Sequence, residues 1–171
     1  MVKRLSLSAF TGLALALCSG TAIAASACLT AAETDAHQLR VLQTQLMVGA
    51  LQCRGDSEAG QRANYNNFVR RYGPELLAGH RTLEAYFRRQ FGAAYQRKLD
   101  AHITVIANEV SQESQNVADF CARIAVVGGA LTAGPGLNLT EVSHGAPITE
   151  IGGPSAACID GTDYATTTSV D

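Results

Sequence analysis

The feature that most constrains the fold of this chain is the spacing of its apolar residues between positions 30 and 132. In four to five successive stretches they recur every three or four residues, which is the period of one face of an α-helix. Glycine, proline or short polar segments separate these stretches. Amphipathic helices joined by short connections pack through their apolar faces. The pattern therefore predicts an all-α bundle of four to five helices over residues 25–132.

The first helix has the clearest boundaries. Thr30 and Glu33 have the spacing of a capping box, in which a hydroxyl and a carboxylate bond to each other's backbone N–H groups. We predict a helix from about 30 to 53, ended by Gly55. The later apolar faces predict helices at about 58–72, 74–91 and 93–111 and a last one from 117 that fades by Gly128-Gly129. The polar run 111–116 reads as a turn or as a solvated stretch of helix.

Composition changes at about residue 133. Residues 133–171 contain three of the four prolines, six glycines and five acidic residues, but no lysine or arginine. Such a segment lacks the apolar surface needed to pack as a helix. We predict a Gly/Pro/Thr-rich acidic tail that is mostly irregular, with a short strand pair between Val142 and 148–151 as the alternative.

The first residues have the pattern of a secretory signal peptide. Lys3 and Arg4 precede an uncharged apolar run, and Ala22-Ile23-Ala24 supplies the small residues of a cleavage site. We predict a signal peptide over 1–24 that is cleaved, and hence a periplasmic or secreted bacterial protein with no membrane span after cleavage. A cut after Ala27 would put Cys28 first, which leaves lipidation of Cys28 open.

Four cysteines remain after cleavage, and an even number in an exported chain predicts two disulfides: Cys28, Cys53, Cys121 and Cys158. Cys28 and Cys53 flank the first helix and are therefore more than ~30 Å apart, whereas a disulfide needs Cα atoms within ~7 Å. The remaining pairings are 53–121 with 28–158, or 28–121 with 53–158. We favour the first, because it ties the first helix to the last and joins the two ends of a small disulfide-bonded bundle.

Charge is distributed unevenly along the chain. The net charge is -2, or -4 once the leader is removed, which argues against a nucleic-acid partner. Residues 62–98 nevertheless hold eight basic residues and seven of the nine aromatic residues that follow the leader. We predict that this Arg/Tyr-rich surface holds an anion such as a polysaccharide, a lipid phosphate or an acidic protein. The candidate ligand-binding residues are Arg70, Arg71, Tyr86, Arg88 and Arg89.

Other chemistry has weaker support in the sequence. None of His37, His80, His102 and His144 lies four residues from another, so we expect no metal site; we also expect no cofactor. The leading hypothesis is an exported, non-catalytic binding or envelope-associated protein. One alternative is a small periplasmic hydrolase of envelope glycan with Glu84, Glu109 or Glu113 as the acid. The other is a structural or secretion-assembly protein, which would expose an apolar groove between helices.

Overall fold

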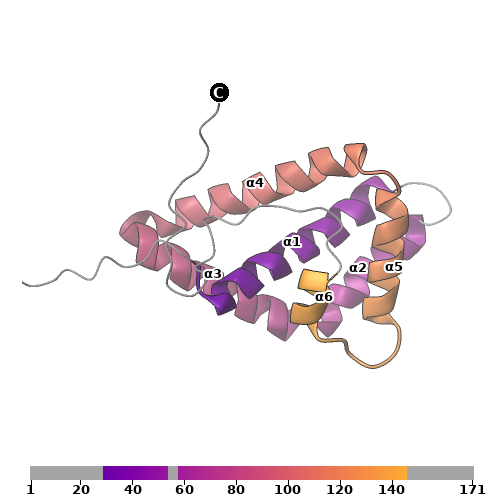
Figure 1. The fold of residues 1–171 in the computed structure, drawn as a ribbon, viewed down its shortest axis with the longest axis horizontal. Helices are drawn as coiled ribbons and strands as arrows, with labels where there is room; N and C mark the ends of the chain where they lie inside the picture. Colours follow the sequence, from indigo (N-terminus) through magenta and orange to yellow (C-terminus); the bar gives the residue numbers. More distant parts are fainter. Residues whose placement is uncertain (1–28, 54–57, 146–171) are drawn as a thin grey trace, which may run out of the picture.

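A computed structural model describes residues 29–53 and 58–145, and these form an α-helical bundle (Figure 1). No strand occurs within these ranges, so the all-α prediction is confirmed. The predicted signal peptide lies outside the described residues. The helices are α1 (Ala31–Gln52), α2 (Glu58–Arg71), α3 (Gly73–Phe91), the 3-10 turn η1 (Gly92–Ala94), α4 (Tyr95–Asn116), α5 (Phe120–Thr132) and α6 (Leu139–Gly145).

The first helix runs through the middle of the bundle and contacts every other α-helix (Figure 1). Its capping box is present: the Thr30 N–H donates to Glu33 Oε2 at 2.9 Å, and the Glu33 N–H donates to Thr30 Oγ1 at 3.3 Å. Because α1 is surrounded by other helices, it buries polar side chains such as His37 and Gln45 together with its apolar ones.

The core consists of two clusters. The larger joins α1, α2, α5 and α6 with the start of α3 and the second half of α4. Its most buried members include Leu42, Phe68, Ile106, Val110, Ile124 and Leu131. The smaller lies where α3 and α4 meet the start of α1 and contains Leu29, Ala36, Leu83, Tyr86, Phe87 and Leu99. The molecule thus has two ends with separate apolar cores.

A disulfide belongs to the larger cluster. Cys53, just after α1, bonds to Cys121 in α5, with their Cα atoms 5.5 Å apart. This confirms the favoured pairing for these two residues and excludes 28–121 and 53–158. Cys28 and Cys158 lie outside the described residues.

Two helices are longer than predicted. α4 continues through 111–116, so this polar run is a solvated helical stretch rather than a turn. The prediction that the last helix fades by Gly128-Gly129 was wrong, since α5 continues to Thr132. At Gly128 an added Cβ would lie 3.4 Å from the Asn64 Cβ of α2. Gly128 therefore packs at ordinary contact distance against α2 and does not end α5.

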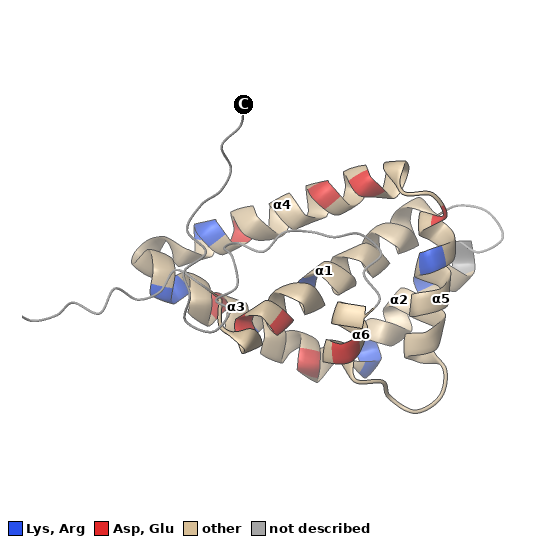
Figure 2. Ribbon diagram, viewed as in Figure 1, with Lys and Arg blue, Asp and Glu red and all other residues tan. Residues whose placement is uncertain are grey.

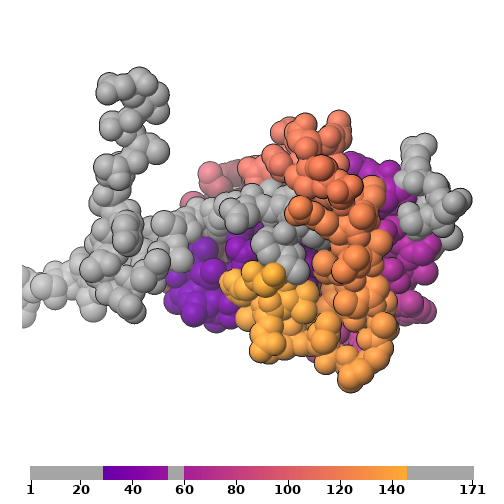
Figure 3. Space-filling model, turned by 45° about the vertical axis from the view of Figure 1, so that its right-hand side comes forward, coloured from indigo at the N-terminus to yellow at the C-terminus, as the bar shows by residue number. Residues whose placement is uncertain are grey.

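The start of the tail also differs from the irregular structure predicted there. Residues 139–145 form α6, and Val142 is helical rather than part of a strand. Asn138 caps this helix, because its Oδ1 accepts a 3.0 Å hydrogen bond from the Thr140 N–H. Leu139 is 6% exposed and belongs to the larger core cluster. Figure 3 shows α6, in yellow, between the start of α1 and α5. The rest of the tail, 146–171, lies outside the described residues.

Candidate functional site

The two arginine pairs of the predicted binding surface lie at opposite ends of α3. Arg70-Arg71 ends α2, and Arg88-Arg89 lies in the last turn of the 19-residue α3. Eighteen helical positions correspond to about 27 Å. Figure 2 shows basic segments at the end where α3 passes into α4 and again at the other side of the molecule. The structure therefore does not bring the four arginines together into one site.

In the first pair, one arginine is used inside the fold. Arg71 donates to the carbonyl oxygens of Thr132 and Gly134, at 3.3 and 2.5 Å, and so holds the end of α5. Arg70 is exposed and donates to the side chain of Asn67, one turn earlier on α2. Both arginines of this pair are exposed, but within the described residues only the hydrogen bonds of Arg71 reach another helix end.

The second pair is divided in the same way. Arg89 forms two hydrogen bonds, of 2.7 and 3.1 Å, with the carboxylate of Glu33, which is 7% exposed, and its guanidinium lies over the ring of the buried Tyr86. These hydrogen bonds lower the pKa of Glu33 below its usual value. Tyr86 and Arg89 thus belong mainly to the packing of α3 on α1.

Arg88, in contrast, is directed outward. Its side chain is 60% exposed and pairs with Glu84 at 2.7 Å. The same guanidinium lies 4.6 Å from the centre of the Tyr95 ring and donates to the Tyr95 hydroxyl at 3.1 Å. Arg88 therefore joins the last turn of α3 to the first turn of α4.

A second cation on an aromatic ring lies beside it. Lys98 Nζ is 5.6 Å from the centre of the Phe91 ring, and Phe91 is 41% exposed although it stacks on the buried Phe87. We name the exposed group Arg88, Phe91, Tyr95 and Lys98 the cationic tip, since it forms the end of the α3–α4 hairpin. Arg97 is also exposed and lies in the same turn of α4 as Lys98, so it adds a third cation near Arg88 and Lys98.

The turn between the two helices depends on one glycine. Gly92 has φ 51° and ψ -126°, a backbone conformation that residues with a Cβ rarely adopt. Its N–H donates to the Arg88 carbonyl oxygen and so ends α3. Because η1 and α4 follow at once, this turn places Phe91 and Lys98 side by side.

The folding of α4 does not account for its two basic residues. The partial positive charge at the start of a helix favours acidic side chains in the first turn and disfavours basic ones. The first turn of α4 holds Arg97 and Lys98 and no acidic residue. Among the residues that the structure describes, neither of the two forms an ion pair. Arg88 and Arg89, at the end of α3, lie where the same effect favours them.

Arg88, one of the predicted ligand-binding residues, is exposed, whereas its neighbours Phe91, Tyr95 and Lys98 were not among the predicted residues. Lys98 and Tyr95 fall within 62–98, and the doublet Arg97-Lys98 at the start of a predicted helix was the signal that could have indicated them. An exposed phenylalanine is not distinguishable from a core phenylalanine by helical spacing alone.

Two histidines that are far apart in the sequence meet behind the tip. His102 Nε2 of α4 is 3.3 Å from His37 Nδ1 of α1, and Phe87 packs against the His102 ring. Burial lowers the pKa of His102 to about 4, with further contributions from His37 and Arg40. Over residues 29–53 and 58–145, no group of three or more His, Cys, Asp or Glu side chains could hold a metal ion.

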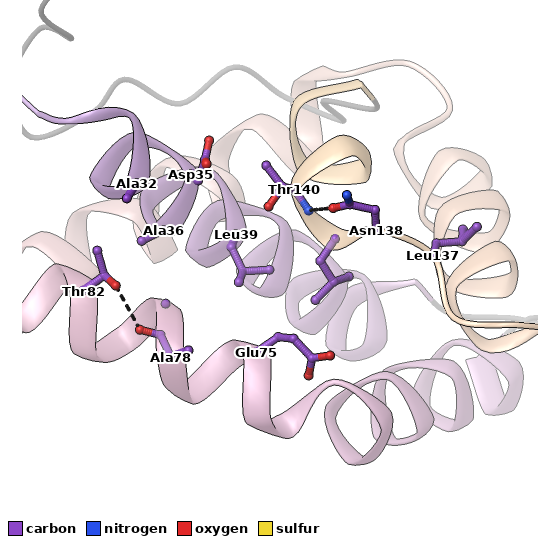
Figure 4. A pocket seen from close by; sticks show the side chains of 12 residues that line it. Ala32, Asp35, Ala36, Leu39, Glu75, Ala78, Thr82, Leu137, Asn138 and Thr140 are labelled. Atoms are coloured by element: carbon purple, nitrogen blue, oxygen red, sulfur yellow. Dashed lines mark hydrogen bonds between the residues drawn. The ribbon is translucent and has the colours of Figure 1, made fainter.

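A groove lies elsewhere, between α1, α3 and the segment 137–140. This groove has a volume of about 420 Å³, and its lining is mainly Ala32, Ala36, Leu39, Ala78, Gly79 and Leu139. Figure 4 shows its two carboxylates, Asp35 and Glu75, on opposite sides of Leu39 and pointing away from each other. Asp35 also pairs with His144 Nε2 at 2.8 Å, which joins α6 to α1.

The geometry of the groove bears on the enzyme hypothesis. Two-carboxylate hydrolysis needs its acidic groups to flank one cleft and to face the same bond. Glu84, Glu109 and Glu113 do not line the groove, and Glu84 is engaged by Arg88. The groove carboxylates are not directed at a common point. The groove therefore gives little support to a hydrolase. The tip gives more support to anion binding.

The chain was compared with models of known protein families, with curated proteins and with solved structures, and none of them matches it. None of the helices described by the structure is both long and apolar enough to cross a membrane. The choice between functions consequently rests on the geometry of the tip and the groove.

Proposed function

We propose that this chain is an exported, non-catalytic binding protein of the bacterial envelope that holds an anionic partner on its cationic tip. The predicted signal peptide and the disulfide Cys53–Cys121 support export, because structural disulfides form in oxidising compartments such as the periplasm. The observation that carries the proposal is the pair of exposed cations, Arg88 and Lys98, on the rings of Tyr95 and Phe91.

The chemistry of the tip favours lipid phosphate as the partner. Lys98 and Arg97 lack carboxylate partners within the described residues, so their charge is available to an anion. Phe91 lies beside Lys98 and is partly exposed at the end of the hairpin. A basic group around an exposed aromatic ring fits a membrane interface, where cations meet headgroups and the ring meets the acyl boundary.

The alternatives depend on the groove. An assembly protein would use an apolar groove between helices, and the groove between α1 and α3 has that form. Nothing in the structure indicates what would cover it, whereas the charges of the tip define the chemistry of a partner. The tip therefore gives the better supported function.

The test measures binding of the mature chain to vesicles of phosphatidylglycerol and phosphatidylcholine, with pure phosphatidylcholine as the neutral surface, at low and high salt. Each basic residue near an anionic surface contributes about 1 kcal/mol, so Arg97→Ala with Lys98→Ala should weaken binding about 30-fold at low salt. Screening should reduce the difference at high salt.

The matched control is Arg70→Ala with Arg123→Ala. These two arginines are exposed on α2 and α5, and their removal changes the net charge by the same amount. We expect less than a threefold effect from the control. Equal loss in both double variants would overturn the tip as the site. Salt-sensitive retention on an anionic glycan, with no retention on vesicles, would overturn the lipid as the partner.

A further inference from the structure

Arg40 of α1 differs from the other arginines of the molecule. It is half-buried, whereas every other arginine within residues 29–53 and 58–145 is exposed. A guanidinium stays charged at every pH at which proteins fold, and moving a charge out of water costs free energy unless an opposite charge compensates it. The surroundings of Arg40 should therefore contain a group that balances its charge.

The hydrogen bonds of Arg40 go to two neutral side chains. Its Nη1 donates to Gln43 Oε1, one turn further along α1, at 2.9 Å, and its Nη2 lies 3.1 Å from His80 Nδ1 of α3. A guanidinium has no acceptor, so His80 Nδ1 accepts this bond and the proton of the neutral ring is on Nε2. These bonds join α1 to α3 but bring no negative charge to Arg40.

No acidic side chain within the described part of the chain forms an ion pair with Arg40. Arg89, in contrast, is paired with the buried Glu33. Burial lowers the pKa of Arg40, and the opposing contribution comes from Tyr65 of α2 rather than from a carboxylate. The charge of Arg40 also contributes to the lowered pKa of His102 on α4. The described helices thus hold a positive charge between them without supplying its counter-charge.

The polar groups around this charge line one hollow between α1 and α3. Its lining consists of Ala36, Leu39, Arg40, Gln43, Leu76, Gly79 and His80. The two helices pack tightly here, since a Cβ added to Gly79 would lie 3.2 Å from Leu39 Cδ2. The hollow is too narrow to admit a water molecule. A ligand would consequently meet Arg40, Gln43 and His80 at its mouth, where these half-buried side chains reach solvent.

The groups that remain for a ligand are mainly donors. Arg40 uses two of its N–H groups and occupies Gln43 Oε1 and His80 Nδ1, which leaves its other N–H groups, the amide NH2 of Gln43 and the Nε2–H of His80. Donors around one uncompensated positive charge favour one negative charge, and the planar fork of a guanidinium matches the two oxygens of a carboxylate. We infer that Arg40, Gln43 and His80 bind a small monocarboxylate at the mouth of this hollow.

This carboxylate site is separate from the cationic tip. His80 precedes Arg88 on α3 by about two helical turns, or about 12 Å. Neither Gln43 nor Arg40 belongs to the tip, because both lie on α1. The inference therefore goes beyond the proposed function and does not depend on it.

The test titrates sodium acetate into the isotopically labelled mature chain at constant neutral pH, with sodium chloride added to keep the ionic strength constant. The NMR signals of the Arg40 Nε–H and of the His80 ring should shift and saturate. Half-saturation should lie in the millimolar range, because a ligand of so few atoms gains little binding free energy. Acetate should also raise the midpoint of urea denaturation, since it binds the folded chain and not the unfolded one.

Two variants of Arg40 and one matched control locate the binding. Arg40→Gln should weaken acetate binding about tenfold or more and abolish the rise of the midpoint. Arg40→Lys keeps the charge but lacks the fork, so it should weaken binding about threefold, and it provides the test if Arg40→Gln does not fold. The control is Arg81→Gln, which removes the same charge from the exposed neighbour of His80 on α3. We expect less than a twofold effect from the control.

The outcomes are distinct. Shifts that do not saturate, or equal acetate affinity of Arg40→Gln and the natural chain, would overturn the site. Equal weakening in Arg81→Gln would also overturn it, because net charge alone would then be the cause. Saturable binding of inorganic phosphate without binding of acetate would overturn the monocarboxylate as the ligand. Acetate binding that is unchanged in Arg97→Ala with Lys98→Ala, in a chain that does not bind vesicles, would support this site and overturn only the proposed function.

Discussion

Arg70-Arg71 and Arg88-Arg89 are the same dipeptide at the ends of two consecutive helices, yet they lie in different surroundings. In each pair the second arginine bonds within the fold, Arg71 to backbone carbonyls and Arg89 to Glu33. Within the described residues, the first arginine of each pair bonds on its own helix, Arg70 to Asn67 and Arg88 to Glu84. Arg88 in addition meets the ring of Tyr95 on α4. The difference between the pairs comes from α4, which brings Tyr95 and Lys98 to the end of α3.

The two ends of the molecule also differ in how they are held. The part of the molecule with Arg70-Arg71 packs on the larger core cluster, which also contains the disulfide residue Cys53. The end with the cationic tip has the smaller cluster and the Arg89–Glu33 pair. Identical arginine doublets thus acquire separate roles from the residues that surround them.

Removal of the disulfide should have the largest effect. Cys53→Ala with Cys121→Ala opens a cross-link between residues 68 positions apart, and the loss of that constraint costs about 4 kcal/mol in the free energy of unfolding. Urea denaturation of the oxidised proteins measures this value. Below the new unfolding transition, binding of vesicles to the tip should persist. A decrease in the free energy of unfolding of less than about 1 kcal/mol would contradict the importance of the cross-link for stability.

At the other end, Arg89→Ala should cost about 2 kcal/mol, because it leaves the carboxylate of Glu33 buried without its cation. Arg88→Ala is the neighbouring control, and it should leave the unfolding free energy within experimental error, since Arg88 is exposed. Vesicle binding should respond in the opposite order, with the larger loss in Arg88→Ala. Equal stability of the two variants would refute the division of roles within this pair.

The tip end should also lose stability on acidification. His102 has a pKa of about 4 in the folded chain and about 6.5 when unfolded, so between these values the unfolded state binds more protons. The contribution of neutral His102 to the free energy of unfolding is complete above pH ~6.5 and is lost as the pH falls to ~4. The full shift would correspond to about 3 kcal/mol, and partial exposure reduces the expected loss to about 1–2 kcal/mol.

The measurement is the free energy of unfolding as a function of pH for the natural chain and for His102→Gln. The variant should lack the slope between pH ~6.5 and ~4, whatever its stability at neutral pH. Both proteins should still lose the stability that the lowered pKa of Glu33 contributes. This loss should occur at lower pH than the loss of stability due to His102. An identical slope in the two proteins would show that His102 is not responsible.

The smallest effect is expected from the first pair. Arg71→Ala removes two hydrogen bonds to the carbonyl oxygens of Thr132 and Gly134 at a partly solvated site, which should cost about 1 kcal/mol. Arg70→Ala should have no measurable effect on stability, and neither variant should change vesicle binding more than twofold. If Arg70→Ala weakened vesicle binding as much as Arg88→Ala, the two pairs would be equivalent in binding, which would contradict their separate roles.

Much of the fold could be predicted from local signals. The capping box of Thr30 and Glu33, the apolar spacing and Gly73-Pro74 depend on neighbouring residues, and the structure has the corresponding helices. The length of the first helix excluded Cys28–Cys53 and left two connectivities open, and the structure has the favoured pair Cys53–Cys121. Glycine was less informative: Gly128 lies inside α5 and does not end it, whereas Gly92 forms the turn that creates the tip.

The sequence by itself determined that the chain forms helices, which residues of each helix are apolar, and that residues 62–98 are rich in arginine and aromatic residues. These properties depend on residues within one or two turns of each other. The tertiary structure alone decided that Arg89 is used by Glu33, that Lys98 lies on Phe91, and that His37 meets His102. Each of these contacts joins two helices, and the spacing within one helix does not specify which side chain of another it will meet.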